Sequence, residues 1–278
     1  MRHSDFFTLK NGIIIPAIGF GTWQIPNGEI AYNSTLSALK SGYRHIDTAL
    51  AYGNEKSVGK AIRDSGIDRS QIFVTSKLPA EVKSYEGALE SIEKTMKNIG
   101  LEYIDLYLIH APWPWTQIGK DCTKENIIVW KAMEEFYKSG RTRSIGISNF
   151  NVKDINAILD NCTVKPMVNQ IKLHIGHRQE EITTHCEKKD ILVEGYSPLA
   201  TGRILNNKGI AEIAKKYDRT VAQVSVRYVL QKGAIPLPKS THPEYIIQNH
   251  DVGFEISEDD MKYLDGLKDT IKVSPDLV

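Results

Sequence analysis

The chain has 278 residues, close to the upper size of a single hydrophobic core, so it holds either one large domain or two small ones. Hydrophobic residues make up 41% and charged residues 25%, as in ordinary globular proteins, and 35 Lys plus Arg balance 34 Asp plus Glu. This balance excludes the basic excess with which proteins bind nucleic acid or a membrane surface, and we expect neither as a partner.

The cysteines and the N-terminus bear on the compartment. Cys122, Cys162 and Cys186 are odd in number and far apart, which is typical neither of a disulfide framework nor of a zinc site. The first residues do not resemble a cleavable apolar leader, and no apolar run approaches the roughly 18 residues that a membrane span needs. We therefore expect a soluble, cytoplasmic protein.

The first predicted element is a β-hairpin. Residues 7–10 and 13–15 flank Asn11-Gly12, a pair that tolerates positive φ and favours a two-residue turn. Because this hairpin precedes the main series of strands, we expect it to cover the floor of the domain.

Short apolar runs then alternate with longer segments of helical periodicity. The predicted strands cover residues 17–21, 43–47, 72–76, 103–109, 144–147, 167–170, 191–195 and 234–236. Between two of them, apolar residues recur at three- and four-residue steps from Ala88 to Ile99, with Ser84 as the N-cap and Gly100 as the stop. Each such segment predicts a helix that crosses back over a sheet.

Eight strand–helix units of similar length predict a parallel sheet closed into a (β/α)₈ TIM barrel, with residues 1–278 as one domain. An open doubly wound sheet is the alternative. It is disfavoured because Gly19-Phe20-Gly21 continues as Thr22-Trp23-Gln24 and lacks the glycines of a dinucleotide-binding turn. Beyond the last strand we expect extra C-terminal helices: Pro243 opens one, and Ser257 with Asp260 caps another that runs to about Lys268.

Polar residues follow three consecutive predicted strands. Asp47 ends the second strand and Tyr52 lies in its loop, Lys77 follows the third strand, and His110 follows the fourth. The carboxyl ends of barrel strands form the active-site face, so these four side chains should converge there. Taken alone, Asp47 is as often a helix cap as a catalyst, Tyr52 and Lys77 are more often surface residues, and His110 is more often a structural histidine. Their joint occurrence at three successive strand ends points to a site.

Such a set suits reduction of a carbonyl group. A phenol has a pKa near 10 and must be tuned before it can give a proton to the developing oxyanion. We expect the Lys77 ammonium to lower the Tyr52 pKa, Asp47 to hold that ammonium, and His110 to orient the substrate oxygen.

At these residues the chain resembles the aldo-keto reductase family, over nearly its whole length. Residues 42–55 read GYRHIDTALAYGNE and are similar to the family signature with its catalytic aspartate and tyrosine. The segments TSK at 75–77 and IDLYLIH at 104–110 resemble those that carry the lysine and the histidine. The resemblance implies Asp47, Tyr52, Lys77 and His110 as the catalytic tetrad of a carbonyl reductase.

The family implies an NADPH or NADH cofactor lying across the barrel mouth. Ser148, Asn149 and Gln170 resemble the groups that hold the carboxamide, and Tyr196 resembles the aromatic residue under the nicotinamide. The resemblance further implies cofactor contacts from Gly21, Thr22, Ser197, Pro198, Leu199, Thr201, Gly202, Lys239, Ser240, Thr241, Tyr245, Gln248 and Asn249. A barrel independently predicts a phosphate site after its last two strands.

Tyr245 stands where NADPH-preferring members have an arginine for the ribose 2′-phosphate. A tyrosine offers one weak hydroxyl in place of a planar fork of donors, so we expect NADPH to be used with only a small advantage over NADH.

The substrate side departs from the family pattern. Ala111-Pro112-Trp113 follows His110 where an aromatic residue and then proline are usual. We interpret Trp23 and Trp113 as an apolar substrate wall and leave Trp115 unassigned. The chain stops at Val278, so the long C-terminal loop of mammalian members should be absent, and the length resembles bacterial members such as diketogluconate reductases.

Other classes of function fit the sequence less well. His174, His177, His185 and Cys186 match no strong metal-ligand spacing, and we expect no metal site. A binding or regulatory member of the same fold remains open in principle because fold does not establish function, but the complete tetrad argues against it. A metal-dependent barrel hydrolase would need His-x-His after the first strand, where Gly21-Thr22 stands. We expect a monomeric enzyme acting on a small carbonyl compound.

Overall fold

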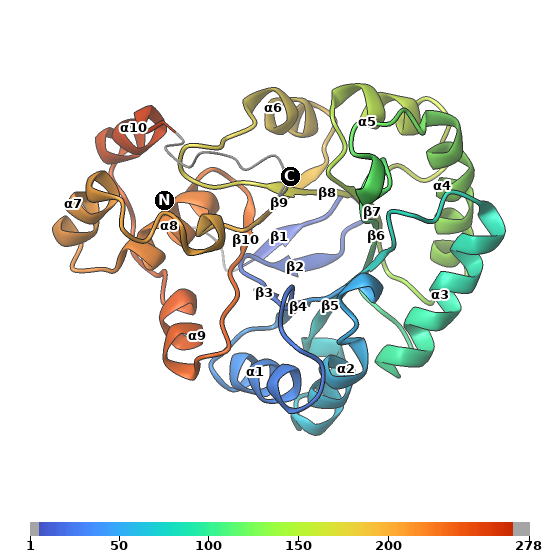
Figure 1. Cartoon of the computed structure of the whole chain (residues 1–278), viewed down its shortest axis with the longest axis horizontal. Coiled ribbons are helices and arrows are strands. Elements are labelled where there is room, and N and C mark those ends of the chain that lie inside the picture. The colour runs from blue at the N-terminus through green and yellow to red at the C-terminus, as the bar shows by residue number, and fades with distance from the viewer. Residues whose placement is uncertain (1–5, 269–278) are drawn as a thin grey trace.

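The computed structural model describes residues 6–268 and consists of an eight-stranded parallel barrel ringed by helices (Figure 1). The barrel strands are β3 (Phe20–Gly21), β4 (His45–Asp47), β5 (Phe73–Leu78), β6 (Leu106–Ile109), β7 (Ile145–Ser148), β8 (Val168–Lys172), β9 (Leu192–Tyr196) and β10 (Ile235–Leu237). The C-terminal segment at 271–278, on which we based the absence of a long loop, lies outside the described residues.

The strands are arranged in chain order from β3 to β10, and each pairs in parallel with the next. Two backbone hydrogen bonds join the first strand to the last segment: Gly19 N lies 3.0 Å from Pro236 O, and Gly21 N lies 3.0 Å from Pro238 O. These bonds close the circle. The predicted (β/α)₈ barrel is confirmed, and the open doubly wound sheet is excluded.

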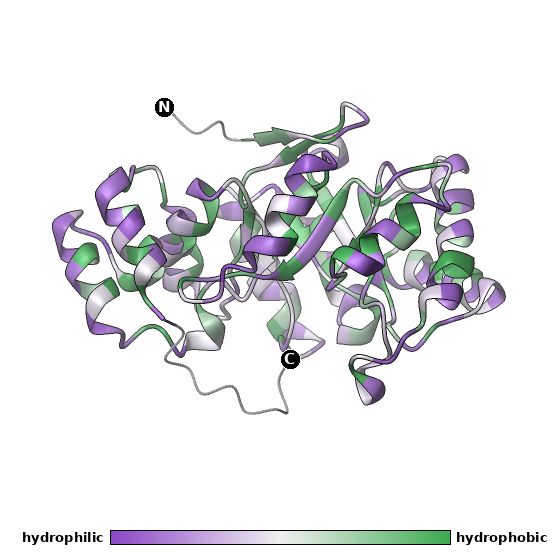
Figure 2. Cartoon of the chain, turned by 90° about the horizontal axis from the view of Figure 1, so that it is seen from above, coloured by the Kyte–Doolittle hydropathy of each residue, from purple (hydrophilic) through white to green (hydrophobic). Residues whose placement is uncertain are grey.

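The helices pack against the outside of the barrel. They are α1 (Glu29–Lys40), α2 (Glu55–Asp64), α3 (Tyr85–Ile99), α4 (Thr123–Lys138), α5 (Val152–Leu159), α6 (Glu180–Lys188), α7 (Lys208–Lys216), α8 (Val221–Gln231), α9 (Pro243–His250) and α10 (Glu258–Gly266). Figure 2 shows hydrophobic residues on the sides that face the sheet and hydrophilic residues on the outer sides. This is the pattern of amphipathic helices that bury one stripe. Within residues 6–268 no helix is both long and apolar enough to cross a bilayer.

Several predicted helix ends are confirmed. The Ser84 hydroxyl accepts a hydrogen bond from Gly87 N, and α3 ends at Ile99 with Gly100 as its C-cap. Helix α9 begins at Pro243, and the Ser257 hydroxyl accepts from Asp260 N at the start of α10. Helix α10 ends at Gly266, two residues before the predicted Lys268, because the backbone at Leu267 is extended.

The N-terminal hairpin is present, with β1 (Phe6–Thr8) antiparallel to β2 (Ile14–Pro16). Its turn differs from the prediction. Leu9 N bonds Ile13 O at 2.8 Å, which leaves a three-residue loop in which Gly12 alone of the Asn11-Gly12 pair takes the left-handed backbone, with φ 82°. Asn11 instead donates its side-chain amide to Arg143 O at 2.9 Å, so this turn is fastened to the barrel.

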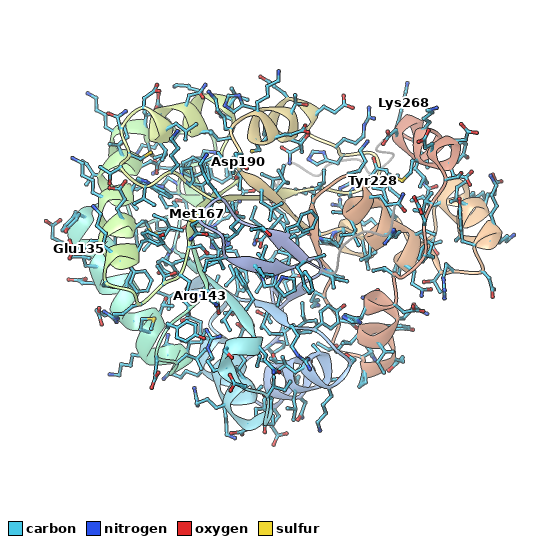
Figure 3. All side chains as sticks on the ribbon, turned by 180° about the vertical axis from the view of Figure 1, so that it is seen from behind. Glu135, Arg143, Met167, Asp190, Tyr228 and Lys268 are labelled. Atoms are coloured by element: carbon cyan, nitrogen blue, oxygen red, sulfur yellow. The ribbon has the colours of Figure 1, made fainter. Side chains whose placement is uncertain are left out.

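The hairpin covers one end of the barrel, as expected. Leu9 and Ile15 are buried against a cluster of inward-facing barrel residues that includes Leu106, Met167 and Ile235. Figure 3 shows the inside of the barrel filled with side chains, Met167 among them. Because this end is sealed by apolar packing, the polar strand ends at the opposite end are left for chemistry.

Candidate active site

The four predicted catalytic side chains meet at the carboxyl ends of three adjacent strands. Asp47 is the last residue of β4, Tyr52 ends the short helix η1 (Leu50–Tyr52), Lys77 lies near the end of β5, and His110 follows β6. Lys77 is the centre of the group: its Nζ lies 2.7 and 2.8 Å from the two carboxylate oxygens of Asp47 and 3.3 Å from the Tyr52 hydroxyl. Thr48 O accepts a further bond from the same Nζ at 3.0 Å.

Lys77 and Asp47 form an ion pair inside the barrel, where Lys77 is completely buried and Asp47 is 3% exposed. Burial alone lowers the pKa of Lys77, but Asp47 and then Tyr52 outweigh it, and the net direction is upward. The ammonium therefore stays protonated next to the phenol.

Tyr52 differs from the prediction in its net pKa. Burial raises the pKa of Tyr52 above its ordinary value of 10.0, and the opposing effect of Lys77 is smaller than the effect of burial. The expected lowering by Lys77 is thus present as one contribution, but it does not decide the direction. At neutral pH the phenol keeps its proton, which is the form a proton donor needs.

His110 stands beside the phenol. Its ring meets the Tyr52 ring edge to face, with centroids 5.5 Å apart, and its side chain is buried. Burial and then the charge of Lys77 hold the pKa of His110 well below 6.5, so the imidazole is neutral. A neutral imidazole can donate one N–H to an oxygen at this position without bringing a second positive charge next to Lys77.

Beneath the tetrad lies a buried polar group that the sequence did not reveal. Gln170 Nε2 donates to Asp47 Oδ2 at 2.8 Å and to Glu194 Oε2 at 2.7 Å. Burial, reinforced by Asp47, raises the pKa of Glu194 to about 8. His45 approaches Glu194 from the other side, with its Nε2 3.7 Å from Oε1, and burial lowers the His45 pKa to about 3. The only available signal was a charged residue in the middle of the apolar run at 191–195.

The three residues predicted to hold a carboxamide are neighbours. Ser148 Oγ donates to Gln170 O at 2.8 Å, and Asn149 Nδ2 donates to Ser148 Oγ at 3.1 Å and to His110 O at 3.0 Å. The Tyr196 hydroxyl donates to Asn149 Oδ1 at 2.9 Å. Asn149 has a left-handed backbone with φ 63°, and the N-cap of α5 is Asn151.

The loop after β9 has an unusual backbone. Ser197 and Thr201 have φ 52° and 56°, and Gly202 has φ 87°. Non-glycine residues rarely adopt this region, and successive N–H groups in such conformations form concave sites that suit anions. Pro198 is buried and Leu199 is partly buried, and Leu199 O accepts from Gly202 N at 2.8 Å. This is the loop at which the resemblance implies the pyrophosphate.

The predicted phosphate end lies at the start of α9. Lys239 is exposed, and the Ser240 hydroxyl accepts from His242 N at 3.1 Å, just ahead of Pro243. The Tyr245 side chain is 52% exposed and lies beside the His242 ring, with centroids 5.5 Å apart. The other cofactor contacts predicted in this region differ in exposure: Thr241 and Gln248 are partly buried, and Asn249 is buried.

Gly21 and Thr22 lie where the first strand meets the last. A Cβ on Gly21 would come within 3.2 Å of Leu237 O, so the close approach of the two backbones favours glycine. Thr22 is completely buried, and its Oγ1 donates to Asp47 O at 2.9 Å. In this structure Thr22 therefore holds the strand end that carries Asp47.

Trp23, Trp113 and Trp115 differ in how they lie relative to His110. Trp115 packs edge to face on His110 at 5.5 Å between centroids, and Trp113 packs on Trp115 at 5.1 Å. Trp23 is 40% exposed. The ring that contacts the tetrad is thus Trp115, which the sequence left uncertain, because the Trp115 side chain folds back toward His110 from η3 (Trp115–Gln117).

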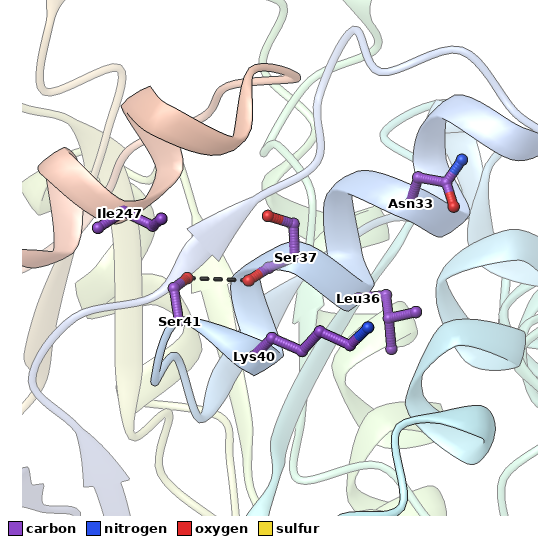
Figure 4. Close-up of a pocket in the computed structure, with 6 residues that line it drawn as sticks. All are labelled: Asn33, Leu36, Ser37, Lys40, Ser41 and Ile247. Atoms are coloured by element: carbon purple, nitrogen blue, oxygen red, sulfur yellow. Dashed lines mark hydrogen bonds between the residues drawn. The ribbon is translucent and has the colours of Figure 1, made fainter.

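Two other features lie apart from the tetrad. Among residues 6–268, no group of three or more His, Cys, Asp and Glu side chains is placed to hold a metal ion, and His174 and His177 stack on each other instead. A shallow depression of about 380 Å³ lies between α1 and α9 (Figure 4). Its lining comes from Asn33, Leu36, Ser37, Lys40, Ser41 and Ile247, none of which belongs to the site.

Comparisons with known proteins agree with this geometry. The family model of the aldo/keto reductase family matches residues 17–269. Glyoxal reductase of Bacillus subtilis (strain 168) is 41% identical over 272 residues, covering 98% of this chain and 95% of that protein. Aldehyde reductase YPR1 of Saccharomyces cerevisiae is 38% identical, covering 93% of this chain and 89% of that protein.

A solved structure gives the same result. An aldo-keto reductase from a Medee basin deep-sea metagenome library superposes with a TM-score of 0.89 at 40% identity, covering 96% of each chain. The chain therefore belongs to the aldo/keto reductase family and is an NAD(P)H-dependent carbonyl reductase.

Proposed function

We propose that this enzyme reduces aldehydes and ketones to alcohols with Tyr52 as the proton donor. The observation that carries the proposal is the 3.3 Å approach of Lys77 Nζ to the Tyr52 hydroxyl, next to a neutral His110. A phenol, a fixed ammonium and an imidazole at one strand-end face are the groups that a developing alkoxide requires.

Each side chain has a separate task in this proposal. When the nicotinamide cofactor is bound, it supplies the hydride that goes to the carbonyl carbon. The Tyr52 O–H bond breaks as the new O–H bond forms on the carbonyl oxygen, which leaves a phenolate that solvent reprotonates. Because burial makes that phenolate costly, the Lys77 ammonium, fixed by Asp47, is needed to stabilise it.

His110 orients the substrate. Its neutral ring gives an N–H to the carbonyl oxygen, and its position against the Tyr52 ring fixes where that oxygen lies. Both donors then act on the same atom, and preorganisation of this kind supplies a large part of the rate enhancement of enzymes.

Hydrogen-bonding groups near the tetrad support the proposed cofactor contacts. Both hydrogens of Gln170 Nε2 are engaged by Asp47 and Glu194, so its oxygen is left to accept from a carboxamide. We propose that Ser148 and Asn149 would complete that contact and that Tyr196 would lie beneath the nicotinamide ring. We propose the loop at 197–202 for the pyrophosphate and Lys239, Ser240 and Thr241 for the phosphate on the adenosine, with Gln248 and Asn249 at the adenine. NADPH is the proposed cofactor, and NADH is accepted because Tyr245 offers no guanidinium.

The substrate is a small carbonyl compound. The curated relatives include a glyoxal reductase and an aldehyde reductase, and Trp113 and Trp115 give this chain an aromatic wall beside His110. We propose Trp23, which follows β3, as a further substrate-facing residue. We propose a cytoplasmic, monomeric, single-domain enzyme.

The test is cofactor oxidation with purified protein. A panel of glyoxal, benzaldehyde and a ketose should consume NADPH at 340 nm with equimolar alcohol formed, identified by chromatography. A protein that binds NADPH tightly but oxidises none with any carbonyl would instead be a binding or regulatory member, and the proposal would fail.

A further inference from the structure

The segment that follows His110 is held by hydrogen bonds to three consecutive carbonyl groups. His110 O accepts from Asn149 Nδ2 at 3.0 Å, Ala111 O accepts from Lys83 Nζ at 3.0 Å, and Pro112 O accepts from Asn126 Nδ2 at 2.8 Å. Each donor comes from a different part of the barrel: the end of β7, the loop before α3, and helix α4. A backbone leaving a strand normally loses its regular partners, and here side chains replace them.

Lys83 and Asn126 also bond each other. Lys83 Nζ donates to Asn126 Oδ1 at 2.9 Å, so the two form one unit that presents two donors to the segment. Asn126 is 2% exposed. An amide buried to this degree is costly unless it is satisfied, and this one donates to the segment and accepts from Lys83.

The ammonium of Lys83 is drawn partly out of water to reach this place. Burial lowers its pKa to about 8, although Cys122, Glu81, Glu125 and Asp154 around it act in the opposite direction. Its two hydrogen bonds go to neutral oxygens. Removing an ammonium from water costs free energy, and here the hydrogen bonds to the segment and to Asn126 offset that cost.

The held segment carries the aromatic rings of the site. Trp113 and Trp115 follow directly, and Trp115 lies on His110. Trp115 N also donates to Glu81 Oε1 at 3.3 Å, two residues before Lys83 along the chain. The loop between β5 and α3 therefore fastens the segment at two points, on either side of Trp113.

We propose that Lys83 and Asn126 are specificity-determining positioning residues, which fix the Trp113–Trp115 wall against His110 and so set the preference for carbonyl compounds with an aromatic or other bulky apolar group. The inference rests on the proposed function, in which this wall faces the substrate. Lys83 and Asn126 act through the backbone of the segment and do not contact the proton donor Tyr52.

The experiment compares Lys83→Met and Asn126→Leu, which remove the donors, with Lys83→Arg, which keeps charge and donors. Lys124→Met is the matched control, because Lys124 is an exposed lysine near the start of α4. For each variant, KM and kcat are measured with benzaldehyde and with glyoxal, and quenching of Trp fluorescence by acrylamide is measured without substrate.

Lys83→Met and Asn126→Leu should raise KM for benzaldehyde by about tenfold, the scale of one lost hydrogen bond to a charged group, and leave KM for glyoxal and both kcat values within about threefold. Acrylamide quenching should increase, because Trp113 and Trp115 become more accessible. Lys83→Arg should restore all of these values, and Lys124→Met should match the wild type.

Equal changes in KM for the two aldehydes, or unchanged quenching in both donor-removing variants, would overturn the inference. If Lys83→Met fails to fold by circular dichroism, Asn126→Leu decides. If the wild type reduces neither aldehyde, the proposed function fails, and quenching alone decides the positioning role: an increase supports it and no change contradicts it.

Discussion

Lys77 and Asp47 form a buried ion pair next to the Tyr52 hydroxyl, with Nζ 2.7 and 2.8 Å from the two carboxylate oxygens. Lys77 has no exposed surface, and Gln170 Nε2 donates to the same carboxylate at 2.8 Å. Burying the pair costs desolvation free energy, but it fixes the position of the ammonium. Removing Asp47 leaves the desolvation cost of Lys77 without the compensating ion pair.

Asp47→Asn should destabilise the fold by about 3–5 kcal/mol, because it leaves the buried Lys77 charge without its partner. Urea denaturation followed by circular dichroism measures this. Asp121→Asn is the control: Asp121 pairs with Lys153 at 2.8 Å, but both side chains are exposed, and we expect stability close to that of the wild type. Equal losses in the two variants would contradict a special cost for the buried pair.

Tyr52→Phe should remove most carbonyl reduction, by about 10²–10⁴-fold, while the dissociation constant of NADPH stays nearly unchanged, because only the hydroxyl is lost. Tyr32→Phe, at a partly buried tyrosine that bonds Asp64 away from the tetrad, is the matched control. A Tyr52→Phe enzyme with more than about a tenth of wild-type activity would show that another group gives the proton.

His110→Ala should raise KM and lower kcat together, since the variant loses both substrate orientation and a donor to the oxygen. His110→Gln, which keeps an N–H donor, should recover part of both. Because the His110 pKa lies well below 6.5, the wild-type pH–rate profile should show no inflection near that value. An inflection there that disappears in His110→Gln would mean that the imidazole titrates in the working range.

Glu194→Gln tests the buried carboxyl group below the tetrad. Burial raises the Glu194 pKa from 4.5 to about 8, so between these values the unfolded chain releases a proton that the folded protein keeps. The unfolded state then binds fewer protons, and the contribution of Glu194 lowers stability as pH rises through this window.

The wild type should therefore lose stability relative to Glu194→Gln as pH rises from 5 to about 8. Over this range the difference in unfolding free energy should shift in favour of the variant by up to a few kcal/mol, and above pH 8 that difference should change little. Glu93→Gln is the control: the hydrogen bond from Arg141 lowers the Glu93 pKa, so both folded and unfolded chains have Glu93 largely ionised above pH 5 and the difference from the wild type should stay nearly constant from pH 5 to about pH 8. Denaturation curves at several pH values measure both. A constant difference between Glu194→Gln and the wild type would mean that Glu194 is ionised throughout.

Tyr245→Arg should strengthen NADPH binding by about tenfold or more and leave NADH almost unchanged, because a guanidinium can bond the ribose 2′-phosphate in a bidentate manner. Lys239→Gly should weaken NADPH and spare NADH. Quenching of Trp fluorescence gives both dissociation constants. If the wild type already prefers NADPH by more than about a hundredfold, another residue supplies the clamp and Tyr245 is not the determinant.

The strand periodicity, the hairpin and the caps at Ser84, Pro243 and Ser257 could be predicted because they depend on residues close together in the chain. The position of the tetrad could also be predicted, since parallel barrel strands bring their carboxyl ends to one face whatever their side chains. Asp47, Tyr52, Lys77 and His110 are therefore already implied by where each strand ends.

The tertiary structure decided the pKa values, which depend on burial, and the contacts between residues that are distant in the sequence. The Tyr52 pKa is raised because desolvation exceeds the effect of Lys77, a balance that no spacing reveals. Glu194 lies 24 residues from the Gln170 amide that it shares with Asp47, and Trp115 reaches His110 only through the path of its loop. The sequence determined which groups the strand ends present, and packing determined their protonation and their neighbours, because both depend on how much water is excluded and on which segments meet in space.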